Sequence, residues 1–157
     1  MNFVKNYRFK EATIKESNII FKWSNDPVVR KNSRTKNKIS FLEHQKWYES
    51  KLKKNDSFFW LYCYKIKPCG LVRIEKKNNF YFLSYLIDFK YRRKKLSKPM
   101  LKEAINKFIL NKNRVKYIYA DVLSDNKLSS NILKSIGFKF NKLNQRNKII
   151  NLILEIN

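Results

Sequence analysis

Glycine is scarce in this sequence of 157 residues, which holds two glycines where about 7% is usual. Loops that wrap around a phosphate normally rely on glycine, because a residue without a Cβ lets the backbone approach the ligand closely. Lys and Asn are correspondingly abundant, a composition typical of a genome with A- and T-rich codons. The scarcity therefore excludes a glycine-rich phosphate loop of the usual kind.

Cysteine and histidine are also few. Cys63 and Cys69 lack the C-x-x-C spacing of a zinc or redox site, and two cysteines make no disulfide framework. With His44 as the single histidine, the chain offers too few ligands for a zinc site. We therefore predict a reduced protein that holds no metal.

Long apolar runs are missing as well. No uninterrupted run approaches the ~20 residues that cross a bilayer. The N-terminal sequence MNFVKNYRFK lacks the apolar region of a signal peptide. These absences predict a cytoplasmic protein without a membrane partner.

Acidic residues are outnumbered. The chain has 12 Asp and Glu against 36 Lys and Arg, which gives a formal net charge of +24 and a pI near 10.1. Such a surface concentrates anions and suits a polyanionic partner, but codon bias explains the excess of lysine equally well. Aromatic residues do not alternate with Arg and Lys as in RNA-binding surfaces, so we do not expect nucleic acid as the partner.

Hydrophobic residues, in contrast, are plentiful. They make up 43% of the chain and include 12 Phe, 9 Tyr and 3 Trp, enough to fill the core of one domain of this length. No repeat, linker or low-complexity segment divides the sequence. We predict a single domain over residues 1–157.

Apolar periodicity predicts strands and helices in alternation. The strands are expected at residues 9–14, 57–64, 71–75, 80–88, 115–123 and 148–156. The helices are expected from Ser17 to Asp26-Pro27, from Ser40 to Lys54 with Glu43 completing a capping box, from Pro99 to Ile109, and from Leu128 to Gly137.

The order of these elements indicates a mixed α/β (α+β) plan. Turn residues at 67–70 and 77–79 predict an antiparallel meander of the second, third and fourth strands. The strand at 115–123 follows a helix and should run parallel to the strand at 80–88. The basic stretch RRKKLS, residues 92–97, then lies where a strand leads into a helix.

Two stretches carry a family resemblance. YLIDFKYRRKKLSKPMLKEAI (85–105) and SDNKLSSNILKSIGFK (124–139), in this order of elements, resemble the GNAT superfamily of acyl-CoA N-acyltransferases over nearly the whole chain. The resemblance implies an acyltransferase with acetyl-CoA as co-substrate and no metal. It also implies a GNAT-like fold: a single mixed sheet of about seven strands, splayed between 80–88 and 115–123, with about four helices.

The basic stretch matches the loop that binds the CoA pyrophosphate in that family, with the pattern Arg/Gln-x-x-Gly-x-Gly/Ala. A helix N-terminus favours a diphosphate there, but Lys95 and Ser97 replace both glycines. A solvated basic turn is the alternative. The resemblance implies that the cofactor-binding residues are Leu86, Ile87, Arg92, Arg93, Lys94, Lys95, Leu96, Ser97 and Lys98.

The downstream stretch implies a second CoA contact. Asn126 matches the residue whose amide bonds the pantetheine arm, although an N-cap role would also explain it. In many family members a Tyr seven residues later protonates the departing thiolate. Leu133 stands there in this chain, so another group or water must supply that proton.

A general base is needed to deprotonate the attacking amine. Asp121, on the strand at 115–123, is the carboxylate best placed to act, through a water molecule, and Glu75 is the second candidate. The alternative is that Asp121 is an exposed residue near a strand end without a catalytic role. Alignment of amine and thioester, and strand N–H groups that polarise the carbonyl, should supply much of the rate.

The N-terminal half bears on the acceptor. WSNDPVVRKNS (23–33) and ISFLEHQKWYESKL (39–52) are similar to the branch that acetylates nucleotide-linked deoxyamino sugars, as in the pseudaminic acid pathway. This similarity implies that Arg30 and His44 face the phosphates or sugar, while Trp47 and Tyr85 wall the apolar side of the ring. Core or structural roles are the alternative for these side chains.

The leading hypothesis is therefore an acetyl-CoA-dependent N-acetyltransferase whose small-molecule substrate is a nucleotide-linked amino sugar. The second is acetylation of a protein N-terminus or another small amine. A third, of another class, is an impaired domain that only binds acyl-CoA or nucleic acid. A homodimer is compatible with all three.

Overall fold

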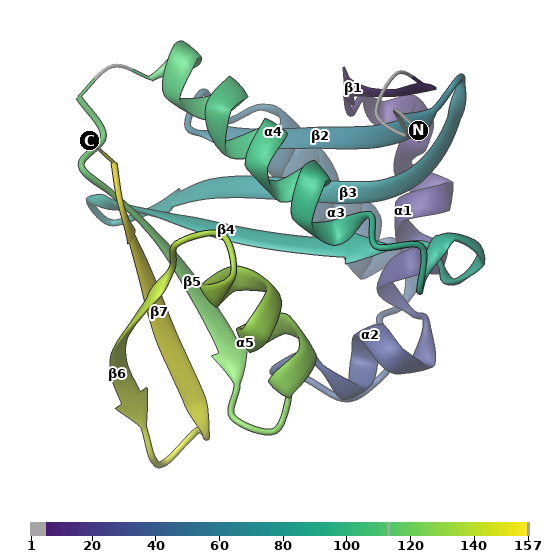
Figure 1. The fold of residues 1–157 in the computed structure, drawn as a ribbon. Coiled ribbons are helices and arrows are strands. Elements are labelled where there is room, and N and C mark those ends of the chain that lie inside the picture. Colours follow the sequence, from purple (N-terminus) through teal and green to yellow (C-terminus); the bar gives the residue numbers. More distant parts are fainter. Residues whose placement is uncertain (1–5, 113, 157) are drawn as a thin grey trace.

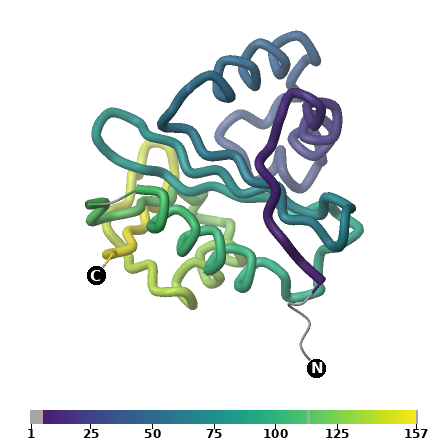
Figure 2. Tube along the Cα trace, turned by 90° about the horizontal axis from the view of Figure 1, so that it is seen from above, coloured from purple at the N-terminus to yellow at the C-terminus, as the bar shows by residue number. Residues whose placement is uncertain are grey.

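The computed structural model describes residues 6–112 and 114–156 and contains one mixed sheet with helices on both faces (Figures 1 and 2). The strand order is β1-β2-β3-β4-β5-β7-β6. The strands are β1 (Tyr7–Glu11), β2 (Ser57–Tyr64), β3 (Lys67–Lys77), β4 (Phe80–Ile87), β5 (Tyr117–Leu123), β6 (Lys139–Asn144) and β7 (Ile149–Glu155). The expectation of a mixed α/β fold with a sheet of about seven strands is confirmed.

Five α-helices and two short 3-10 helices accompany these strands in the described residues. They are η2 (Ile14–Glu16), α1 (Ser17–Ser24), α2 (Pro27–Lys31), α3 (Phe41–Leu52), η3 (Phe89–Tyr91), α4 (Ser97–Asn111) and α5 (Lys127–Lys134). No helix of the described chain is long and apolar enough to span a bilayer.

The sheet separates in its middle. β2, β3 and β4 form the predicted antiparallel meander. β4 and β5 are parallel, as expected, but they pair only at Tyr81↔Ile118 and Phe82↔Tyr119. Beyond these pairs the two strands diverge toward their C-terminal ends (Figure 1). The predicted splay is confirmed, and it leaves two strand edges without partners on the side of the gap.

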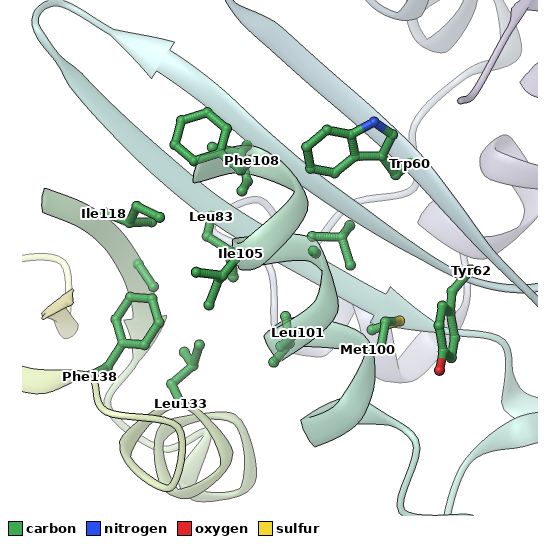
Figure 3. Close-up of a cluster of buried hydrophobic side chains, with 14 of the residues drawn as sticks. Trp60, Tyr62, Leu83, Met100, Leu101, Ile105, Phe108, Ile118, Leu133 and Phe138 are labelled. Carbon is green, nitrogen blue, oxygen red and sulfur yellow. The ribbon is translucent and has the colours of Figure 1, made fainter. Parts of the chain in front are cut away.

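Each face of the sheet has its own core. On one face, α4 packs its buried side chains on β2 to β5, and Leu133 of α5 joins this cluster (Figure 3). On the other face, α1 and α3 pack Ile20, Trp23 and Tyr48 against alternate residues of β2. The tube in Figure 2 shows α4 and the N-terminal helices on opposite sides of the strands. A side chain in the gap can therefore point toward either layer.

Several element boundaries differ from the prediction. The strand expected at 9–14 ends at Glu11, because Thr13 instead caps η2 with a capping box. The turn expected at 67–70 lies earlier, at Lys65, which has a φ of 53°. Pro68 then falls inside β3, beside the register shift between Tyr62 and Cys63, where a missing N–H is tolerated.

Helix α2, strand β6 and the two 3-10 helices were not predicted. Asp26-Pro27 was expected to end a helix, but Asp26 also caps α2, with Pro27 at its start, a favourable position for proline. Every residue of strand β6 is exposed, and the strand lacks the apolar alternation that identifies a half-buried strand. The predicted capping box of Ser40 and Glu43 is present at the start of α3.

Candidate active site

A cleft of about 1950 Å³ occupies the gap between β4 and β5. Its lining includes Leu83 and Tyr85, which belong to the core under α4, and Trp47 and Leu71, which belong to the core under α3. The cleft therefore reaches both layers of the structure. Parallel strands that separate in this way create a binding crevice, because backbone groups and side chains at their ends become accessible to a ligand.

The loop between η3 and α4 forms one end of the cleft. Arg93 has a φ of 61° and Lys95 a φ of 56°, a left-handed conformation that favours glycine. In the described chain, no protein acceptor takes the backbone N–H groups of residues 93–98. These donors lie at the N-terminus of α4, where the helix dipole also favours an anion. The loop can therefore bind a phosphate although it has no glycine.

Both ends of η3 are tied to the N-terminal helices. Trp23 Nε1 of α1 donates to Asp88 Oδ2 over 2.8 Å. Arg92 donates through Nε to the Ile87 carbonyl over 3.1 Å and through NH2 to Asp26 Oδ1 over 2.9 Å. Arg92 was expected to bind pyrophosphate; it lines the cleft, and its guanidinium also organises the loop. Asp26 and Trp23, which sequence reasoning did not identify, hold the loop in place.

The other predicted cofactor residues divide into two groups. Lys94 is absent from the cleft wall, and its Nζ lies 5.0 Å from the centre of the Tyr91 ring. The remaining ones all line the cleft: Leu86, Ile87, Arg93, Lys95, Leu96, Ser97, Lys98 and Asn126.

Asn126 lies at the start of α5 and lines the same cleft. Its Oδ1 accepts from the Ser129 N–H over 3.2 Å, so the side chain is an N-cap. Its Nδ2 donates to no acceptor in the described chain. The N-cap role and a ligand contact are therefore compatible, because they use different atoms of one amide.

A hydrogen bond between two hydroxyl groups crosses the gap. Tyr85 Oη on β4 lies 2.9 Å from Ser129 Oγ on α5. Burial raises the pKa of Tyr85, against a smaller lowering by the hydrogen bond with Ser129, so the phenol is protonated at neutral pH. Leu133, one turn further along α5, is buried and has no proton to donate.

Asp121 of β5 lines the cleft on the side of α3. One carboxylate oxygen pairs with Arg34 NH2, and the other accepts from Asn151 Nδ2 over 2.7 Å. Asn141 donates in turn to Asn151 Oδ1 over 2.8 Å. Arg34, which comes from the loop between α2 and α3, was not predicted as a site residue. This network holds the carboxylate in position beside the gap.

Glu75, the second candidate base, is absent from the cleft wall. It is buried under α3, where Lys51 Nζ lies 2.6 Å from its Oε1 and Arg73 lies 3.8 Å from its Oε2. Burial alone would raise its pKa, but Arg73 and Lys51 outweigh this effect, and the net pKa is lowered. This arrangement gives Glu75 a structural ion pair.

Three of the predicted acceptor residues, Arg30, His44 and Trp47, line the cleft on the side of α2 and α3, whereas Tyr85 belongs to the core under α4. His44 is buried, and its Nε2 lies 3.1 Å from the Ser17 carbonyl, so that nitrogen is not available to a ligand. Burial also lowers the pKa of His44, which leaves the ring neutral at pH 7. Trp47 lines the cleft and stacks under the Arg73 guanidinium at 5.3 Å. Arg30 donates to Ser33, Thr35 and Asn37 and thereby braces the loop that carries Arg34.

Positive charge dominates this side of the cleft. Among the described residues, five cations line it, against the two carboxylates of Glu43 and Asp121. These cations are Arg30, Arg34, Lys38, Arg73 and Lys77. An anionic ligand is therefore favoured here as well as at the loop before α4.

Metal ligands do not gather anywhere in the described chain. No group of three or more His, Cys, Asp or Glu is placed to hold an ion. Cys63 and Cys69 are both free and buried, and burial raises the pKa of each thiol.

Sequence comparison gives one match. The family model of the acetyltransferase (GNAT) domain matches residues 8–139. A search of the curated proteins finds no match.

Solved structures with the same fold are numerous and distant in sequence. The spermidine N-acetyltransferase of Vibrio cholerae, solved with CoA and spermine, has a TM-score of 0.82 at 16% identity, over 96% of this chain and 95% of that one. The aminoglycoside acetyltransferase AAC(6')-Ib, solved with coenzyme A, has a TM-score of 0.78 at 12% identity, over 95% and 94%. A domain from Methanocaldococcus jannaschii reaches 0.81 at 18% identity, over 96% and 98%. These likenesses establish the fold.

Proposed function

The chain belongs to the GNAT acetyltransferase family, and from this premise we propose that it transfers the acetyl group of acetyl-CoA to an amine of an anionic small molecule. A nucleotide-linked amino sugar is the substrate class that we expect. One observation carries the proposal: a single cleft has an anion-binding helix N-terminus at one end and a second cluster of cations on the acceptor side.

The loop before α4 suits the CoA diphosphate. The N–H groups of residues 93–98 are free to donate, and Arg93, Lys95 and Lys98 add positive charge. Asn126 Nδ2 can donate to a pantetheine carbonyl, and the unpaired edges of β4 and β5 can bond its amides as a strand would. Related enzymes with this fold are solved with CoA.

The acceptor side favours an anion over a polycation. Spermine and aminoglycosides carry several positive charges, and a site for them would need carboxylates. Here Arg34 already neutralises Asp121, so Glu43 is the one described carboxylate of that wall without a cationic partner. Lys38 and Lys77 would instead attract the phosphates of a nucleotide. We infer an acceptor whose amine is carried by a phosphorylated molecule.

Asp121 is the base that we assign to the reaction. As the amine nitrogen attacks the acetyl carbonyl carbon, a C–N bond forms and the C–S bond breaks. The amine proton passes through a water molecule to the Asp121 carboxylate, which Asn151 and Arg34 hold in place. Alignment of the two substrates in one cleft supplies a further part of the rate.

Binding and turnover would test the proposal in sequence. Isothermal titration with acetyl-CoA should give saturable binding that weakens with salt, because exposed charges are screened. CoA release should then be followed with a UDP-linked 4-amino-4,6-dideoxyhexose, the same sugar without nucleotide, spermidine, an aminoglycoside and a peptide with a free N-terminus. We expect the highest kcat/KM for the nucleotide-linked sugar, with product inhibition by UDP.

Two charge reversals, one before α3 and one within it, provide a matched pair of variants. Lys38→Glu, on the acceptor wall, should raise KM for the nucleotide-linked acceptor without changing KM for acetyl-CoA. Lys46→Glu, an exposed position away from the cleft, should change neither. A higher kcat/KM for spermidine or the aminoglycoside would overturn the anionic acceptor, and absent acetyl-CoA binding would overturn the whole proposal.

A further inference from the structure

Acyl transfer from a thioester leaves a thiolate, which needs a source of protons. When the C–S bond breaks, the electron pair stays on sulfur, so a nearby proton donor stabilises the developing charge. Leu133 on α5 cannot act in this way. Among the described residues, two phenols line the cleft: Tyr91 lies on η3 in the loop at its end, whereas Tyr85 lies on β4 where the strands diverge.

Tyr85 is positioned by contacts on both sides of the gap. Its Cα partner on β3 is Val72, so the backbone is held within the central meander. Its hydroxyl reaches across to Ser129 Oγ at 2.9 Å, in the first turn of α5. Asn126, whose N-cap bond reaches the Ser129 N–H, lies in the same turn. The hydroxyl pair thus lies beside the amide assigned to the pantetheine arm.

We propose that Tyr85 donates a proton to the departing CoA thiolate, and that Ser129 positions the phenol and returns a proton to it. The inference rests on the proposed function, since it requires a CoA thioester in this cleft. It gives Tyr85 a catalytic role in place of the wall of a sugar pocket.

Each proton in the proposed step has a donor and an acceptor. The phenol O–H gives its proton to sulfur and forms CoA thiol, while the amine loses one proton to water and Asp121. Ser129 passes a proton from solvent to the phenolate, and its own hydroxyl is restored by the next water. The net change is amine plus acetyl-CoA to amide plus CoA thiol, with no other reactant.

The other charged groups around the cleft lie on elements other than α5. Every cleft-lining side chain that α5 contributes is neutral. The loop and the start of α4 contribute Arg92, Arg93, Lys95 and Lys98, β3 contributes Arg73 and Lys77, β5 contributes Asp121, and the segment from α2 to α3 contributes Arg30, Arg34, Lys38, Glu43 and His44. These groups remain unchanged when Tyr85 is replaced by Phe, so the comparison isolates one hydroxyl.

The test measures the thiol of bound CoA and needs no acceptor. Thiolate absorption is followed against pH for the CoA complex, with the desulfo-CoA complex as the blank that cancels protein tyrosines. A hydrogen bond donated to the thiolate lowers the thiol pKa, so Tyr85→Phe should raise it by roughly one to two pH units. With an acceptor found by the substrate panel, kcat should fall about 100-fold while KM for acetyl-CoA stays constant.

Two further variants serve as a control and as a second test. Tyr81→Phe removes a phenol from the same strand, but its hydroxyl faces Asp56 and lies outside the cleft, so the thiol pKa should stay at the wild-type value. Ser129→Ala should raise the thiol pKa by less than Tyr85→Phe, and it provides a second reading if Tyr85→Phe does not fold.

The outcomes separate this inference from the one on which it rests. CoA binding with the same thiol pKa in wild type, Tyr85→Phe and Ser129→Ala would overturn the role of Tyr85 and leave the acetyltransferase assignment intact. Absent CoA binding by wild type, measured by titration calorimetry, would overturn both. A raised thiol pKa in Tyr85→Phe, with unchanged CoA affinity, would support the proposal.

Discussion

Arg92 and Asp26 lie 66 residues apart in the sequence, yet Arg92 NH2 donates to Asp26 Oδ1 over 2.9 Å. The same carboxylate oxygen caps α2 through the N–H groups of Val28 and Val29. One side chain therefore joins the loop before α4 to the helix that carries Arg30. The two ends of the cleft are mechanically connected through this ion pair.

Asp26→Asn should weaken acetyl-CoA binding without removing the cap. Asn caps a helix about as well as Asp, so the variant removes mainly the ion pair with Arg92. We expect the free energy of unfolding to fall by about 1 kcal/mol and Kd for acetyl-CoA to rise roughly five-fold, because the loop is less well held. Denaturant unfolding and titration calorimetry measure these changes. Asp56→Asn, whose exposed ion pairs are with Lys76 and Lys112, should leave Kd unchanged, and an equal effect of both variants would contradict the prediction.

Lys95→Gly should relieve strain in the phosphate loop. A residue with a Cβ in the left-handed conformation destabilises the folded state by about 1 to 2 kcal/mol. Glycine removes this strain, but it also makes the unfolded chain more flexible, which offsets about 0.4 to 1 kcal/mol of the gain. We therefore expect the melting temperature to stay constant or rise. Lys94→Gly, at a neighbour without positive φ, should lower it. A lower melting temperature for Lys95→Gly than for Lys94→Gly would count against the strain.

Crowding by the Lys95 Cβ can be separated from its charge. Lys95→Gln keeps the Cβ and removes the charge, whereas Lys95→Gly removes both. Loss of an exposed charge costs about 1 kcal/mol or less of affinity. If the Cβ crowds the diphosphate, the glycine variant should bind acetyl-CoA more tightly than the glutamine variant in titration calorimetry. Ser97 already lies in α4, so Ser97→Gly should bring no such gain.

The two carboxylates considered as bases can be told apart by kinetics. Asp121→Asn should lower kcat by about 100-fold while Kd for acetyl-CoA stays constant, because it removes the base and no group assigned to CoA. Glu75→Gln lies outside the cleft and should leave kcat unchanged when the assay runs well below its melting temperature. Initial rates and calorimetry on both variants measure this difference. A large fall in kcat for Glu75→Gln alone would assign the base to Glu75.

Glu75 should nevertheless matter for acid stability. Its folded pKa is lowered, with Arg73 and Lys51 outweighing burial, so its contribution is present above the unfolded pKa, near 4.3. That contribution is lost as the pH falls through the lower folded value. Glu75→Gln should therefore cost roughly 1 to 3 kcal/mol at pH 7, and the difference from wild type should shrink below about pH 4. Denaturant unfolding between pH 3 and pH 7 measures it, and a difference independent of pH would contradict the assignment.

Local chemistry made most elements predictable. Helix α3 could be found from the capping box of Ser40 and Glu43, and α4 from its apolar spacing, because both signals lie within a few residues of chain. Where the sheet opens was implied by the family resemblance and by no local signal. In contrast, β6 is exposed and carries little apolar pattern, so its strand conformation depends on pairing with β7.

Tertiary packing decided which atoms remain available at the site. Sequence reasoning and the family resemblance gave Asp121 as a candidate base, Asn126 as a pantetheine contact and Tyr85 as a wall of the acceptor site, and the basic loop indicated an anion site. No local signal could show that Arg34 would pair with Asp121 across 87 residues, or that Ser129 would meet Tyr85 across 44. Such contacts arise only when packing closes long stretches of chain, because their energies are small beside the entropy of closure. Sequence motifs and the family resemblance therefore named the candidate groups, and the fold determined which of them line the cleft.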